Sequence, residues 1–160
     1  MNTRAVVIAG VASSVVLAMW EMVVETILPS GAGFFGAPIA IGATIVRNLQ
    51  GSTNPIPFDG LALVLGLAGH MMNAVILAAI FAIGVGRRNL GTGALVIAGM
   101  AWGAAVFAGM WFVVVPVVDP LMGNLNAPAF VVGHLMWGAT LGFVWARYSE
   151  HARSYMTTVA

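Results

Sequence analysis

Four long runs of hydrophobic residues follow one another along the chain, separated by segments rich in glycine, proline and polar residues. The runs cover about residues 5–28, 61–84, 94–115 and 128–146. A helix rises 1.5 Å per residue, so roughly 20 residues cross a hydrocarbon core of about 30 Å. The pattern therefore predicts an all-α integral membrane protein, with four transmembrane helices in a single domain over residues 1–160.

Residues at the ends of these runs are typical of helix boundaries. Asp59 and Asn126 stand immediately before hydrophobic runs, where N-cap residues are expected. The first run would also fit a signal peptide, because a positive charge precedes it and small residues follow it. Its length, and the presence of Glu21 and Glu25 near its end, favour a membrane helix instead.

Two connections on the same side of the predicted bundle differ in length. The first, residues 30–60, contains an apolar stretch at 38–49 that predicts a short interfacial or re-entrant helix, too short to cross the membrane. The glycines at 31–36 match a dinucleotide-binding spacing, but no strand precedes them, so we interpret the segment as a flexible turn. In the second connection, Asp119 precedes a proline and is predicted to be a turn residue.

The chain also contains matched dipeptides that indicate an internal repeat. These are Met19-Trp20 with Met110-Trp111, and Gly69-His70 with Gly133-His134. They divide the chain into units of about 5–86 and 94–147, each with two helices and one outer connection. Because each unit has an even number of spans, the copies would share one orientation. We therefore expect two tandem related helical hairpins.

Composition narrows the range of functions. Hydrophobic residues make up 61% of the chain and charged residues only 7%, against roughly 25% charged in soluble domains. The absence of cysteine excludes disulfides, thiolate nucleophiles and thiolate metal sites. A net charge of +1 provides no basic surface for nucleic acid, so the expected partners are the lipid bilayer and other membrane proteins.

The arginines predict the orientation in the membrane. Five of them fall on one side of the predicted topology, Arg4, Arg87, Arg88, Arg147 and Arg153, and only Arg47 falls on the other. Cytoplasmic loops are enriched in positive residues. Both termini are therefore predicted to be cytoplasmic, in a membrane of the bacterial inner-membrane type.

Ionisable and amide side chains inside the runs are the candidate functional residues. They are Glu21, Glu25, His70, Asn73 and His134. Polar groups are costly in lipid and should face the bundle interior. The simplest interpretation is that each histidine is neutral and hydrogen-bonded between helices, with Glu21 or Asn73 as partner.

Two further interpretations assign chemistry to the histidines. In the first, His70 and His134 are the two axial ligands of a b-type haem held between helices. In the second, they join Glu21 and the thioethers of Met72 and Met136 in a metal site, for which copper would suit the sulfur ligands. Without a metal, the same acids and histidines could relay protons.

No motif of a soluble-type catalytic site is present, since the chain has no nucleophile elbow, P-loop or zinc-protease motif. The sequence predicts a small polytopic protein that acts as a subunit or accessory component of a larger membrane complex or a homo-oligomer. The alternatives are a haem-binding anchor in electron transfer, and a small proton- or metal-handling transporter.

Overall fold

The fold is described from a computed structural model, which places residues 2–86 and 88–158, with side chains described up to residue 149. All secondary structure in these residues is helical. Four helices are long and apolar enough to cross a membrane, which indicates a membrane protein. They are α1 (Thr3–Ile27), α3 (Gly60–Val85), α4 (Thr92–Gly109) with its continuation, and α6 (Ala127–Thr158).

Side chains cap three of these helices at their N-termini. The Asp59 carboxyl accepts the Ala62 N–H at 2.8 Å, and the Asn126 side chain accepts the Ala129 N–H at 3.0 Å. Both predicted caps are therefore confirmed, and each satisfies a backbone donor that the helix leaves free. Asn2 caps α1 in the same way.

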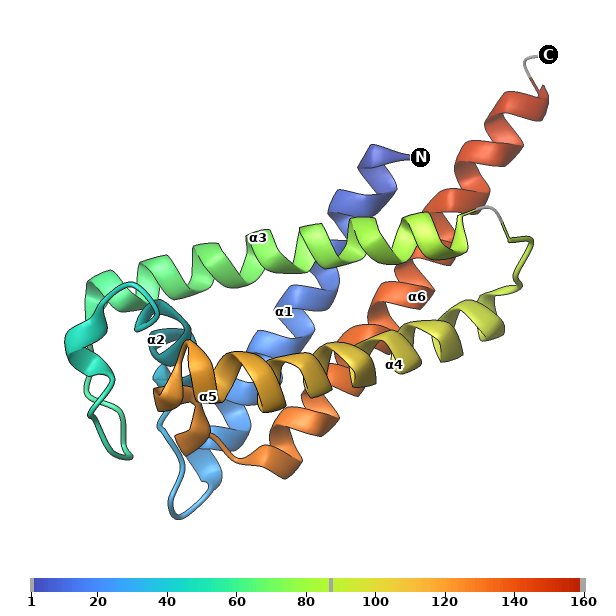
Figure 1. The fold of residues 1–160 in the computed structure, drawn as a ribbon. Helices are drawn as coiled ribbons and strands as arrows, with labels where there is room; N and C mark the ends of the chain where they lie inside the picture. The colour runs from blue at the N-terminus through green and yellow to red at the C-terminus, as the bar shows by residue number, and fades with distance from the viewer. Residues whose placement is uncertain (1, 87, 159–160) are drawn as a thin grey trace.

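Helices α1 and α6 pack side by side in the middle of the molecule, α3 packs on α1, and α4 packs on α6 (Figure 1). By contrast, α3 and α4 make few contacts with each other. Among residues of the membrane-crossing segments, 56% are buried in α6 and 39% in α1, but only 17% in α3 and 11% in α4. The bundle is therefore open between α3 and α4.

Glycines bring α4 and α6 close together. A Cβ added to Gly103 would run into the backbone carbonyl of His134, and one added to Gly99 into that of Gly138. Small residues at helix interfaces let backbones approach in this way. The small-residue spacing in these two helices therefore contributes to their packing.

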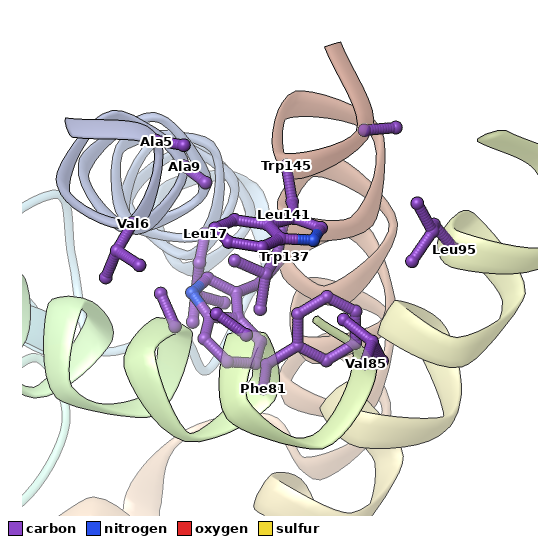
Figure 2. Packing of buried hydrophobic residues seen from close by; sticks show 13 residues of the cluster. Ala5, Val6, Ala9, Leu17, Phe81, Val85, Leu95, Trp137, Leu141 and Trp145 are labelled. Atoms are coloured by element: carbon purple, nitrogen blue, oxygen red, sulfur yellow. The ribbon is translucent and has the colours of Figure 1, made fainter. Parts of the chain in front are cut away.

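Buried hydrophobic residues form two clusters, one toward each end of the bundle. Figure 2 shows the first cluster, in which Trp137 and Trp145 of α6 and Phe81 of α3 fill the space beside α1. The second cluster joins α2 (Gly36–Gly42) to the two outer connections and includes Ile39, Leu121 and Met122. Between the clusters, the packing is interrupted by polar side chains.

The first outer connection differs from its predicted form. In place of one helix over 38–49, the structure has α2 and then a single 3₁₀ turn, η1 (Arg47–Leu49). The Thr44 hydroxyl donates to the Ile41 carbonyl at 2.8 Å, and the Gln50 amide donates to the Ala43 carbonyl at 3.0 Å. These side chains take carbonyls that a longer helix would use, so α2 ends early.

The third span continues past its predicted end. After α4 the chain forms a π-helix, η2 (Met110–Val114), whose turns are wider than those of an α-helix. It then returns to α-helical geometry in α5 (Val115–Val117), which contains Pro116. The wider turn shifts the hydrogen bonding and accommodates a proline, which has no N–H to donate. A 3₁₀ helix, η3 (Pro120–Asn124), then leads to α6.

Both termini and the α3–α4 connection lie at the same end of the bundle (Figure 1). Arg4 and Arg88 are close to helix ends on that side, and Arg147 lies in the second half of α6, which ends there, whereas Arg47 belongs to the opposite end. Arg87 lies outside the described residues, and the side chain of Arg153 lies outside those described. The arginines that the structure describes are therefore divided between the two ends of the bundle as the sequence predicts.

Candidate functional site

A pocket lies between the two hydrophobic clusters, and five helices contribute to its wall. It is bounded by Leu17 and Glu21 of α1, by residues of α2, α3 and α4, and by Phe130, His134 and Trp137 of α6. The cavity is small, with a volume of about 60 Å³, which leaves room for only a few water molecules. The pocket brings Glu21, His70, Asn73 and His134 together from three different helices.

Glu21 is the most unusual residue of this pocket. Its side chain is only 3% exposed, and neither carboxyl oxygen has a hydrogen-bond partner. The carboxyl packs against α6, where a Cβ on Gly133 would lie 2.8 Å from Glu21 Oε1. A buried polar group without a partner costs free energy, so Glu21 does not stabilise this fold through hydrogen bonds.

His70 is held by the helix beside it. Its Nε2 lies 3.1 Å from the backbone carbonyl oxygen of Ser14 in α1. The ring is thus hydrogen-bonded across a helix interface, as the simplest interpretation expects, but its partner is a backbone carbonyl rather than Glu21 or Asn73.

His134 is buried and is held by its own helix. Its Nδ1 lies 2.9 Å from the carbonyl oxygen of Phe130, one turn earlier in α6. The ring centroids of Phe130 and Phe107 lie 4.4 and 5.9 Å from that of His134, both edge-to-face. These contacts fix the ring orientation and leave Nε2 as the nitrogen not used by the backbone.

The two Gly-His pairs, which match in sequence, have different surroundings. A Cβ on Gly133 would meet Leu17, Trp20 and Glu21 of α1, whereas a Cβ on Gly69 would have no atom within 4 Å. The cause is the packing of α6 against α1, which has no counterpart between α3 and α4.

Glu25, one turn after Glu21, has a structural role. One carboxyl oxygen accepts the Ala32 N–H at 2.8 Å, and the other accepts the Asn126 N–H at 2.7 Å. The side chain therefore ties the end of α1 to the first outer connection and to the start of α6. Its oxygens are occupied, unlike those of Glu21.

The remaining candidate residues lie at the edge of the pocket or outside it. Asn73 lines the pocket but is otherwise exposed. Met72 is 65% exposed and Met136 is 37% exposed, and neither lines the pocket, where Met110 and Met122 stand instead. Within the described part of the chain, no three or more acidic or histidine side chains converge to hold a metal ion. The predicted ligand set of Glu21, His70 and His134 is thus not assembled into a metal site.

A polar network that the sequence analysis did not identify closes the outer end of the bundle. The Gln50 amide donates to Asp119 Oδ1 at 2.6 Å, and Gln50 Oε1 accepts the Leu121 N–H at 3.0 Å. Nearby, Asn54 donates to the carbonyl of Asn124. These bonds join the two outer connections, which provide pocket residues such as Pro38 and Met122.

Asp119 lies in the turn between α5 and η3, as predicted, and also joins this network through its bond to Gln50. It is fully buried, and its Oδ2 has no hydrogen-bond partner. Burial raises the pKa of the Asp119 carboxyl, against the opposing effects of the Gln50 hydrogen bond and the nearby Arg47 charge. No sequence motif identifies Gln50 or Asp119, because Gln50 is about 70 residues away in the chain from both Asp119 and Leu121, to which it bonds.

Comparisons with protein-family models, with curated proteins and with solved structures found no match to this chain. The functional argument therefore depends on the geometry of the bundle and its pocket.

Proposed function

We propose that this protein is a membrane subunit that works in a larger assembly, with α3 and α4 as its contact surface. The observation that carries the proposal is the separation of α3 from α4, which leaves both helices largely unburied although α1 and α6 form a packed core. A helix from another membrane protein is the occupant that fits this surface, because Gly69 on α3, where an added Cβ would meet no atom within 4 Å, lets a neighbouring helix approach closely.

Asn73 supports this assignment. It lies within α3, more than three turns from either helix end, and is exposed in the single chain. Among the described residues it has no hydrogen-bond partner. An amide facing hydrocarbon without a partner costs free energy, whereas a hydrogen bond between helices contributes about 1–2 kcal/mol in model peptides. A partner helix would supply that bond.

Site-specific photocrosslinking in native membranes tests the proposal. A benzophenone amino acid is introduced at Ile76 on α3, which is 50% exposed, and at Val15 on α1, which is 43% exposed, as the matched control. We expect a protein adduct from Ile76 and only lipid adducts from Val15. The mass of the adduct distinguishes another subunit from a second copy of the chain. Lipid adducts alone from both positions, with a monomeric mass in mild detergent, would contradict the proposal.

The topology is part of the same proposal. Both termini would be cytoplasmic in an inner-membrane setting, because Arg4, Arg88 and Arg147 share one end of the bundle. The tandem duplication of hairpins also stays a prediction, supported by the matched dipeptides.

The haem-anchor alternative receives less support from the pocket. The space that both histidines line has room for a few water molecules, and Nε2 of His70 is engaged at Ser14. A macrocycle would require α3 to move away from α1. The small volume and the unpartnered acid are more compatible with a small polar group.

A further inference from the structure

The pocket between the two hydrophobic clusters meets both conditions for holding water. A cavity keeps ordered water only where it offers enough room and several polar partners. The volume of about 60 Å³ is enough for a few water molecules. The wall includes four polar side chains from α1, α3 and α6, which are Glu21, His70, Asn73 and His134. Room and polar partners are therefore both present.

Each of these side chains has hydrogen-bonding atoms that the described residues leave unused. Both oxygens of Glu21 are buried without a partner. A backbone carbonyl only accepts, so His70 Nε2 and His134 Nδ1 carry the protons in their bonds to backbone carbonyls. In a neutral ring the other nitrogen is then an acceptor. The amide of Asn73 has two N–H donors and an acceptor, so it can bond both to pocket water and to a partner helix.

Glu21 lies in this pocket without a cation to balance its charge. No arginine in the described part of the chain lines the pocket, and the chain contains no lysine. The wall residues from α2, α4 and the second outer connection are uncharged, and His70 and His134 are the titratable groups from the other helices. Glu25, one turn along α1, is a second acid. A buried carboxylate without a partner costs free energy unless it takes up a proton.

Water can link these groups although they belong to three helices and Glu21 bonds directly to none of them. Bridging water joins polar groups that are too far apart for a direct hydrogen bond, so the side chains need not meet at one point. A site for water and a proton also needs no passage between α3 and α4. That opening stays available to a partner helix.

We infer that the pocket is a hydrated proton-binding site, in which Glu21 takes up a proton from pocket water and returns it to that water. On uptake, an O–H bond of a hydronium ion breaks and an O–H bond forms on the Glu21 carboxylate, which becomes a neutral acid. On release, the same bonds change in the opposite direction. The inference goes beyond the proposed assembly role and does not depend on it.

Infrared difference spectroscopy of the protein in lipid nanodiscs, at a series of pH values, tests this inference. A protonated carboxylic acid has a C=O stretching band that a carboxylate lacks. We expect the Glu21 band to decrease as the pH is raised. After a change from H₂O to D₂O the band should shift before the amide II band reports exchange of the helix backbone, because pocket water reaches the carboxyl.

Variants assign the band to one residue. Glu21→Gln keeps the shape of the side chain and breaks no hydrogen bond, since the carboxyl has none. It should remove the Glu21 band. Asp119 is a second buried acid, and burial raises the pKa of its carboxyl. Asp119→Asn is therefore the matched control, which should remove only the contribution of Asp119 and leave the Glu21 band in place.

The possible results decide the question. A pH-dependent acid band that shifts early in D₂O, is lost in Glu21→Gln and remains in Asp119→Asn supports the site. A Glu21 band that does not change with pH overturns the exchange of a proton. A band that shifts only together with the helix backbone overturns the contact with water. An identical spectrum in Glu21→Gln shows that Glu21 binds no proton, which also overturns the inference.

Discussion

Glu25 and Glu21 provide a sharp test of the structure, because they lie one turn apart on α1 with opposite hydrogen bonding. Both oxygens of Glu25 accept backbone N–H groups, whereas neither oxygen of Glu21 has a partner. Replacement of each by glutamine changes the same atoms at nearly the same depth. We expect Glu25→Gln to lower stability and Glu21→Gln to leave it nearly unchanged.

The magnitude follows from the two bonds of Glu25. A hydrogen bond to a charged group contributes about 1.5–3 kcal/mol. Glutamine keeps one acceptor oxygen and turns its NH₂ group toward the other N–H, so Glu25→Gln loses one bond, or about 1.5–3 kcal/mol. Glu25→Ala loses both bonds, or about 3–6 kcal/mol.

Thermal unfolding in mild detergent, followed by tryptophan fluorescence, measures these differences. For a chain of this size, 1 kcal/mol corresponds to roughly 2–4 °C in Tm. Glu25→Gln should therefore lower Tm by about 3–12 °C, and Glu21→Gln by an amount near zero. Equal Tm values for the two variants would refute the assignment of Glu25 as a structural residue and Glu21 as a free one.

Two further predictions concern the helix interface and the outer network. Gly103→Ala places a Cβ against the carbonyl of His134 and should lower stability by about 1–3 kcal/mol through overpacking. Gly69→Ala is the control, because a Cβ at that position has free space and should leave stability unchanged. The Tm values of the two variants test this difference. Because burial raises the pKa of Asp119 above its unfolded value, stability should fall as pH rises from about 4 through the raised pKa. Denaturation measured at several pH values in this range gives the change of stability with pH, and Asp119→Asn should remove that change. If the variant keeps the same pH dependence, the dependence does not come from Asp119.

The residues of the candidate site could be predicted from the sequence, but the role of each residue could not. Polar residues are costly in a membrane helix, so Glu21, His70 and His134 were identifiable from the sequence alone, and all three line the pocket. The different functions of Glu21 and Glu25 were not predictable. The second donor to Glu25 is the Asn126 N–H, 101 residues away, and no local pattern encodes a contact at that separation.

The four apolar helices and two of their N-caps were predictable from the sequence, because hydropathy and capping act over neighbouring residues. How those helices pack was not predictable in this way. The α1–α6 contact and the opening between α3 and α4 depend on which surfaces meet. Those contacts join residues far apart in the chain, where helix periodicity carries no information about the partner.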